Sequence, residues 1–182
     1  ATNNNRITVT DSVSTSPDFK GFYMTDLDAL SSLTFINSDF TGTRYSILLS
    51  SMAAGSSLTI SGGTVTSSTN QNSLYVMAPN GASISATGVA FTGECRLGDA
   101  ATYTDNIVRF TDLTVDAPNE AALHVVGLTG GSLLCDGCNL ISSGNSDGLY
   151  LLGLGDMDVT LKRFVFTSSL ASSTADGLLI LS

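Results

Sequence analysis

Residues 58–66 read Leu-Thr-Ile-Ser-Gly-Gly-Thr-Val-Thr, and this pattern recurs along the chain in steps of about 25 residues. Apolar or small residues occupy the first, third and eighth positions, and mainly polar or small residues lie between the third and the eighth. Five further copies begin at Leu33, Ile84, Val108, Leu133 and Val159. A fixed period of this length is typical of a solenoid, in which each repeat packs on its neighbours.

The first and eighth positions of the repeat are expected to form stacked columns in a hydrophobic core. The first column contains the six residues that begin the copies. The closing residues of the second column are Phe40, Val65, Phe91, Val115, Leu140 and Phe166, and a degenerate first copy is expected to close at Val13. One repeat alone would be too small to be stable, so stability must come from the stacking of repeats.

Each period contains a second apolar cluster, in which two residues alternate as in a strand and a third follows three positions later. Its clearest copies are Phe22/Met24/Leu27, Ile47/Leu49/Met52, Leu123/Val125/Leu128 and Leu149/Leu151/Leu154, with shorter or weaker ones at Leu74/Val76, Cys95/Leu97/Ala100 and Leu178/Ile180. Gly-containing pairs such as Gly62-Gly63, Thr87-Gly88 and Asp136-Gly137 provide the backbone freedom that a corner requires. Helical turns are expected only within residues 26–32 and 52–57.

These patterns predict an all-β fold, a right-handed parallel β-helix of about seven coils with about 25 residues each. The handedness is taken from the general preference of parallel crossovers. We treat residues 1–182 as a single domain, and expect it to be a segment of a longer chain or a subunit of a stacked assembly. The spacing between the two clusters varies from coil to coil, which indicates one variable corner.

The repeats resemble the right-handed parallel β-helix superfamily often called pectin-lyase-like. This group contains polysaccharide lyases and hydrolases, phage tailspikes, autotransporter passengers and repetitive surface adhesins. Residues 58–65 are most similar to repeats of secreted or surface-exposed β-helix proteins, and the likeness extends from about Ile7 to Leu181. The resemblance implies an architecture and no particular activity. The Asn-Thr-Asp, Asp-Asp, His-Gly and Arg-x-Lys segments of the hydrolases are absent from this sequence.

Composition excludes some classes of protein. A net charge of −9 argues against nucleic-acid binding, which requires clustered cations. No apolar run approaches the ~20 residues of a membrane span. Only 13% of the residues are charged, and the acidic, hydroxyl-rich composition favours an extracellular or virion-surface protein. Three cysteines do not indicate a disulfide framework.

The strongest candidate cluster of acidic residues lies at the bend after the first strand. Asp112, Asp136 and the pair Lys162-Arg163 fall on consecutive coils, so Asp136 and Arg163 are expected to form an ion pair. Such carboxylates could serve glycoside cleavage or calcium binding. The interpretation as an exposed ion pair is favoured. Asp156 and Asp158 present the same choice between calcium ligands and solvated turn residues, and we favour the second.

Histidine and cysteine provide four further candidate residues. His124, the only histidine, lies between two inward residues and is expected to be an outward surface residue. Cys135 and Cys138 form a C-x-x-C sequence that elsewhere indicates zinc or redox chemistry. Both fall on core columns, so we interpret them as buried small hydrophobic residues. Cys95 also occupies an apolar position.

Outward threonines form a ladder after the bend. Its members are Thr41, Thr66, Thr92 and Thr167, and Asp116 and Ile141 interrupt it. Threonine ladders on flat β-helix faces can order water, as in ice-binding proteins. The β-propensity of threonine explains the same pattern without ice.

Three functional hypotheses remain. The first is a structural or adhesive β-helix on a cell or virion surface, assembling end to end through exposed end coils or flanking chain. The second is a polysaccharide-binding or polysaccharide-cleaving domain, with glycans as partners, and the third is ice binding. We assign no catalytic, cofactor-binding or metal-binding residues, and no nucleic-acid partner or membrane span. The enzyme question stays open, with a non-enzymatic role favoured.

Overall fold

The structure is a computed structural model that describes residues 4–69, 71–99, 101–118, 120–142, 147–168 and 178–181, the last four and Ser168 by their backbone alone. Within these ranges the chain forms strands β1 to β21 and no helix. No segment there could therefore cross a bilayer as a helix. The predicted all-β class is confirmed.

The strands form three parallel sheets of seven strands, and consecutive strands of the chain enter sheets A, B and C in turn. Sheet A contains β1 (Arg6–Thr10), β4 (Ser32–Ile36), β7 (Ser57–Ser61), β10 (Ser83–Thr87), β13 (Tyr103–Thr111), β16 (Leu128–Asp136) and β19 (Asp158–Lys162). Sheet B contains β2 (Val13–Thr15), β5 (Asp39–Gly42), β8 (Thr64–Ser67), β11 (Ala90–Thr92), β14 (Thr114–Ala117), β17 (Asn139–Ser142) and β20 (Val165–Ser168). Sheet C contains β3 (Lys20–Leu27), β6 (Tyr45–Met52), β9 (Asn72–Pro79), β12 (Glu94–Leu97), β15 (Leu123–Val126), β18 (Leu149–Leu152) and β21 (Leu178–Leu181).

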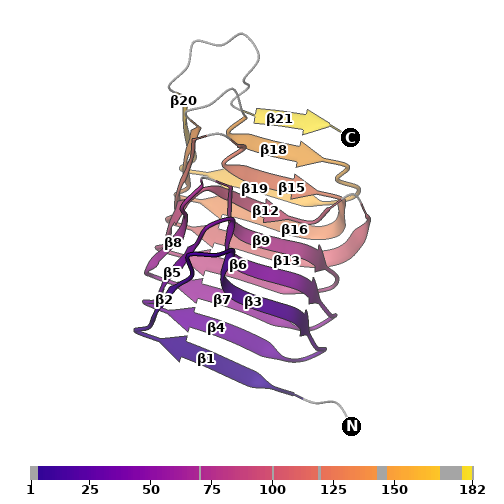
Figure 1. The fold of residues 1–182 in the computed structure, drawn as a ribbon. Coiled ribbons are helices and arrows are strands. Elements are labelled where there is room, and N and C mark those ends of the chain that lie inside the picture. The colour runs from indigo at the N-terminus through magenta and orange to yellow at the C-terminus, as the bar shows by residue number, and fades with distance from the viewer. Residues whose placement is uncertain are drawn as a thin grey trace.

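One circuit through sheets A, B and C is a coil, and the coils are stacked with the N-terminus at one end and the C-terminus at the other (Figure 1). The seven strands of each sheet correspond to about six turns of about 25 residues, close to the count of about seven coils predicted from the sequence. The result is a parallel β-solenoid, as the period predicted.

Inward side chains from the three sheets form one core along the solenoid. The register of the two predicted columns is confirmed, because their members are direct neighbours on adjacent strands, but Val159 at the end of the first column is 37% exposed and lies outside the core. The first column is Leu33, Leu58, Ile84, Val108, Leu133 and Val159. The second is Phe40, Val65, Phe91, Val115, Leu140 and Phe166. Adjacent strands lie ~4.8 Å apart, so each coil buries its apolar side chains against the next coil.

The corner between sheets A and B, corner 1, has two residues in every coil, and the first has a positive φ. These first residues are Asp11, Asn37, Gly62, Gly88, Asp112, Gly137 and Arg163, with φ from 45° to 71°. Glycine adopts this conformation freely, and Asn and Asp tolerate it better than other residues. The predicted role of Gly62 and Gly88 at a corner is confirmed.

The corner between sheets B and C, corner 2, varies as predicted. It runs from Gly42 to Tyr45 in one coil, from Thr92 to Glu94 in another and from Ser168 to Leu178 in the last. Corner 1 therefore keeps a constant length and geometry, while corner 2 differs in length and in exposed side chains from coil to coil, next to sheet C.

The predicted position of Val13 in the core is wrong. Val13 pairs with Asp39, while Ser14 lies beside Phe40. Val13 is therefore an outward residue, 76% exposed, because the alternation of strand β2 is offset by one position from the expected pattern.

The two expected helical turns are also wrong. Tight turns take their place, each closed by a backbone hydrogen bond, from Ser31 N to Asp28 O at 3.1 Å and from Ser56 N to Ala53 O at 3.0 Å. Positive φ angles at Leu30 (63°) and Gly55 (77°) prevent the chain from continuing as a helix.

Candidate functional site

The outer faces of the three sheets differ in chemistry. Hydroxyl side chains dominate much of sheets A and B, as in the neighbouring residues Thr34, Thr59 and Ser85 of sheet A. Sheet C instead presents a column of mainly aromatic and basic residues, interrupted by the buried Leu48, which we call the sheet C strip. In strand order its members are Tyr23, Leu48, Tyr75, Arg96, His124 and Tyr150.

Ring contacts connect parts of the sheet C strip. The Arg96 guanidinium carbon lies 5.4 Å from the centre of the Tyr75 ring. The Tyr45 ring, beside the strip, lies 5.9 Å from Tyr75. At the other end, the His124 and Tyr150 rings meet edge to face at 4.6 Å and 80°. Such arrangements are favoured by the ring quadrupole and leave ring surface available to a partner.

Glu94 lies at the centre of the strip and is only 3% exposed. Its carboxylate accepts hydrogen bonds on both oxygens. Oε1 lies 2.7 Å from His124 Nδ1, and Oε2 accepts from the Asn72 side-chain amide. Buried carboxylates are tolerated where such partners satisfy them.

The local backbone explains why Glu94 is buried. Corner 2 is reduced here to Gly93, whose φ is 107°, and the register between β9 and β12 shifts at Glu94/Cys95. A Cβ on Gly93 would lie 2.3 Å from the Gln71 carbonyl oxygen. This close approach brings the start of β12 against β9, so the side chain of Glu94 is covered by the neighbouring coils.

Two further charged side chains share this environment. Glu120 is exposed, but partial desolvation, and then the charge of Glu94, raise the pKa of its carboxyl, while His124 and Arg96 oppose the shift. The Arg96 Nε is buried and has no hydrogen-bond partner among the described residues. We call Asn72, Glu94, Arg96, Glu120 and His124 the central cluster.

The described part of the chain encloses no pocket and contains no group of three or more potential metal ligands. The sheet C strip is an open surface, so its chemistry is that of stacking and hydrogen bonding along a line. Rings can pack against flat apolar faces, while the central cluster supplies hydrogen-bonding groups.

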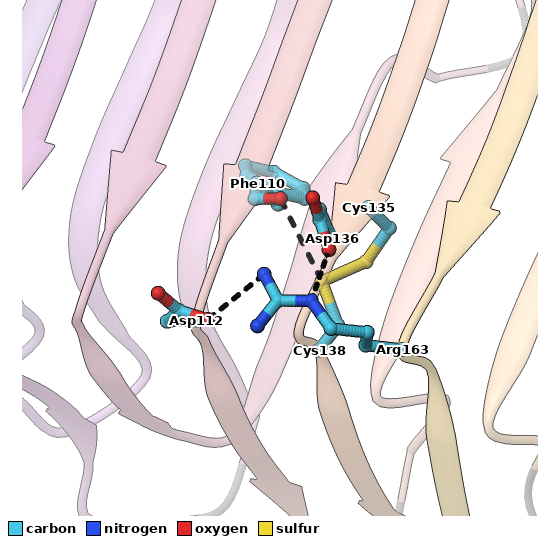
Figure 2. A network of polar contacts seen from close by, with 6 residues as sticks. All are labelled: Phe110, Asp112, Cys135, Asp136, Cys138 and Arg163. Carbon is cyan, nitrogen blue, oxygen red and sulfur yellow. Dashed lines mark hydrogen bonds and ion pairs between the residues drawn. A yellow bond between two sulfur atoms is a disulfide. The ribbon is translucent and has the colours of Figure 1, made fainter.

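The predicted ladder at corner 1 is confirmed (Figure 2). Arg163 Nε donates to Asp136 Oδ1 at 2.8 Å, and an Arg163 terminal nitrogen lies 3.5 Å from Asp112 Oδ1. The hydrogen bond to Asp136 is the main cause that raises the pKa of Arg163. Lys162 instead sits on β19, paired with Asp136 along the backbone. All these side chains are at least partly in solvent, which fits an exposed ion pair.

Arg163 also has a positive φ, which an arginine tolerates less well than the Gly, Asn and Asp residues at the equivalent position of the other coils. We expect Arg163→Gln to melt close to the parent, because exposed ion pairs contribute little. Arg163→Gly should melt higher than Arg163→Gln, since glycine relieves the left-handed strain. Thermal unfolding followed by circular dichroism measures both. A large loss in Arg163→Gln would show instead that the Asp136 contact stabilises the corner strongly.

Cys135 and Cys138 form a disulfide, which corrects their interpretation as free buried residues. Corner 1 brings them together, because Cys135 ends its inward series in β16 and Cys138 is the inward second residue of the corner. The core column predicted for Cys135 is confirmed, because Cys135 lies between Phe110 and Leu161 on adjacent strands. Figure 2 shows the bridge beside Asp136. Cys95 remains a buried thiol, and burial raises its pKa, so it is unreactive.

The outward orientation predicted for His124 is confirmed, but its side chain is only 18% exposed, because Glu94 and Tyr150 cover it. The sequence does contain the strip: its members are the middle residues of each second apolar cluster. Strand alternation predicts an outward position for His124, and the same alternation applies to the other members. The burial of Glu94 depends on the shift at Gly93, which no spacing rule reveals. Asp156 and Asp158 are exposed.

The threonine ladder has the predicted register. Thr41, Thr66 and Thr92 are neighbours on successive strands. Asp116 and Ile141 then interrupt the series before Thr167.

Comparison with known proteins does not assign the chain to a family. The chain matches no protein-family model, no curated protein and no solved structure. The class of protein is therefore defined by the fold alone, a parallel β-solenoid, and membership of the pectin-lyase-like superfamily stays a prediction.

Proposed function

We propose that this chain is a structural, adhesive β-solenoid of a cell or virion surface that binds uncharged glycan chains along the sheet C strip. The observation that carries the proposal is the strip itself. Tyrosines lie on three of its described strands and His124 on a fourth, in a line along the solenoid axis, while the equivalent outward positions of sheets A and B are largely hydroxyl side chains.

The chemistry of an uncharged glycan fits this surface. Sugar rings have apolar C–H faces that pack on aromatic rings, and hydroxyl rims that donate and accept hydrogen bonds. The open, linear strip suits an extended polymer better than a small molecule, which requires a concave site. The net charge of −9, with Glu94 and Glu120 at the centre of the strip, disfavours a polyanion.

The disulfide supports the proposed location. Disulfides persist in oxidising compartments and are rare in the cytosol. The Cys135–Cys138 bridge therefore favours a protein that is exposed outside the cell or on a virion.

Affinity electrophoresis in gels containing soluble uncharged glucan, mannan or xylan tests the proposal. Tyr75→Ala and Tyr150→Ala should each weaken retardation about tenfold, equivalent to ~1.4 kcal/mol. Thr59→Ala and Thr66→Ala, on sheets A and B, are matched controls and should migrate like the parent. Absence of retardation in every gel, or equal loss in the controls, would contradict the proposal.

Glycan cleavage is a second candidate, favoured by the proximity of Glu120, whose carboxyl pKa is raised, to the Glu94–His124 pair. Two carboxyl groups in different environments are the usual requirement of glycoside hydrolysis. Incubation with the retarded polysaccharide and measurement of new reducing ends separates binding from cleavage. Loss of those ends in Glu120→Gln would support cleavage, whereas no release by the parent chain leaves binding alone.

A further inference from the structure

The N-terminal end of the sheet C strip differs in charge from its centre. Five side chains gather there on the first two coils, and we call them the end group: Phe19, Lys20, Tyr23, Arg44 and Tyr45. The Phe19 and Tyr45 rings meet edge to face at 5.3 Å. Phe19 is 42% and Tyr23 47% exposed, so the end group offers ring surface to a partner.

Both cations of the end group lie against rings. Lys20 Nζ is 3.5 Å from the centre of the Tyr23 ring. The Arg44 guanidinium carbon is 5.3 Å from the centre of Tyr45 and 5.6 Å from that of Phe19. The ion pairs found among the described residues belong to His124 and Arg163, and none involves Lys20 or Arg44.

A cation held on a ring face keeps its hydrogen-bond donors. A stacked guanidinium donates in its own plane, and an ammonium group has three donors of which a ring uses few. Lys20 is the first residue of β3 and pairs with Tyr45, the first residue of β6, and Arg44 directly precedes Tyr45, so the two cations lie on neighbouring coils ~4.8 Å apart. That spacing lets both reach one anionic group.

Charge is distributed unevenly along the strip. From Tyr45 to Gly93 the sequence contains no charged residue, and the next one is Glu94. The strip therefore begins with two unpaired cations, continues through uncharged Leu48 and Tyr75, and then reaches the acidic side chains of the central cluster. A uniform polyanion would meet Glu94 and Glu120, whereas a single anionic substituent can lie over the end group alone, in which the charged side chains are Lys20 and Arg44.

We infer that Lys20 and Arg44 form an anion subsite at the N-terminal end of the strip, which takes one carboxylate or sulfate on an otherwise uncharged glycan. This inference rests on the proposed function and adds a direction of binding to it. The glycan binds in one direction, with its charged unit over the end group and its neutral units over Tyr75 and Tyr150. Charge-assisted hydrogen bonds of this kind are about twice as strong as neutral ones.

Isothermal titration with three probes tests the inference. The probes are an uncharged oligosaccharide from the polysaccharide that retards the chain, the same oligosaccharide with one terminal carboxylate, and the same oligosaccharide with one terminal sulfate. The parent chain should bind at least one charged probe about tenfold more tightly than the uncharged probe at low salt. The two charged probes distinguish a uronate ligand from a sulfated one.

The variant Lys20→Gln/Arg44→Gln should bind all three probes equally, with affinity for the uncharged probe unchanged. Arg6→Gln/Lys162→Gln removes two cations outside the strip and should retain the preference. Added salt should abolish the preference in the parent chain, which gives a second measurement that needs no variant.

The outcomes separate the two claims. Equal binding of charged and uncharged probes by the parent, or a preference that survives in Lys20→Gln/Arg44→Gln, overturns the anion subsite while the glycan strip stands. Absence of binding to every probe overturns the proposed function, and the subsite with it.

Discussion

Gly63→Ala should unfold the solenoid or come close to doing so. Gly63 is the second residue of corner 1 in its coil, with φ 82°. An added Cβ would lie 2.2 Å from the Ser38 carbonyl oxygen and 2.7 Å from the Ser38 nitrogen, so it would collide with the backbone of the preceding coil. Backbone cannot rotate away as a side chain can. Left-handed strain and overpacking together should lower the free energy of unfolding by about 3–5 kcal/mol.

Gly88→Ala is the matched control, because Gly88 occupies corner 1 in the next coil with φ 62° and an added Cβ there meets nothing within 4 Å. Its free energy of unfolding should fall by only about 1 kcal/mol, because alanine is strained at a positive φ. Urea unfolding followed by circular dichroism compares the two. Similar losses for both variants would show that backbone strain alone, and no contact between coils, limits corner 1.

Much of this fold follows from the sequence, because a solenoid repeats one local solution. The columns that begin at Leu33 and Phe40 could be predicted from spacing, since any other register would expose their apolar side chains. The corner residues Gly62 and Gly88 could be predicted from conformational freedom. Val13 could not, because strand β2 is short and its alternation lacks a second apolar residue to fix the phase.

The candidate site was harder to predict for physical reasons. Ion pairing of Asp136 with Arg163 follows from the period, since equivalent positions stack. The burial of Glu94 instead depends on a one-residue corner that interrupts the period. The Cys135–Cys138 disulfide depends on a corner geometry that brings side chains three residues apart together, while the composition pointed away from a bridge.

The constant and variable corners together explain where a binding surface can develop. Corner 1 is limited by contacts such as that of Gly63 with Ser38, so sheets A and B meet in the same way in every coil. Corner 2 tolerates changes of length, because the entropy of a loop grows slowly with its length. Sheet C borders that corner, so its outer face can gain side chains such as Glu94 and Arg44 without altering the core.

His124→Leu should lower the free energy of unfolding by about 3 kcal/mol. The substitution removes the hydrogen bond between His124 and the nearly buried Glu94 carboxylate, which then keeps, among the described residues, only its hydrogen bond from the Asn72 side chain. His124→Gln is the control. The glutamine amide can donate to Glu94, so the free energy of unfolding of this variant should fall much less than that of His124→Leu. Urea unfolding at pH 7 gives both values.

The double variant His124→Leu/Glu94→Met separates loss of packing from exposure of an unpaired charge. If His124→Leu is unstable because the buried Glu94 carboxylate lacks a donor, removing that carboxylate should stabilise the variant. The free energy of unfolding should then recover by at least ~1 kcal/mol, even though the double variant has lost a second native side chain. A double variant weaker than His124→Leu would mean that Glu94 stabilises β12 through Asn72 alone. Recovery would instead show that the central cluster is held together by mutual satisfaction of its polar groups, which is the property that would let it present fixed hydrogen-bonding groups to a glycan.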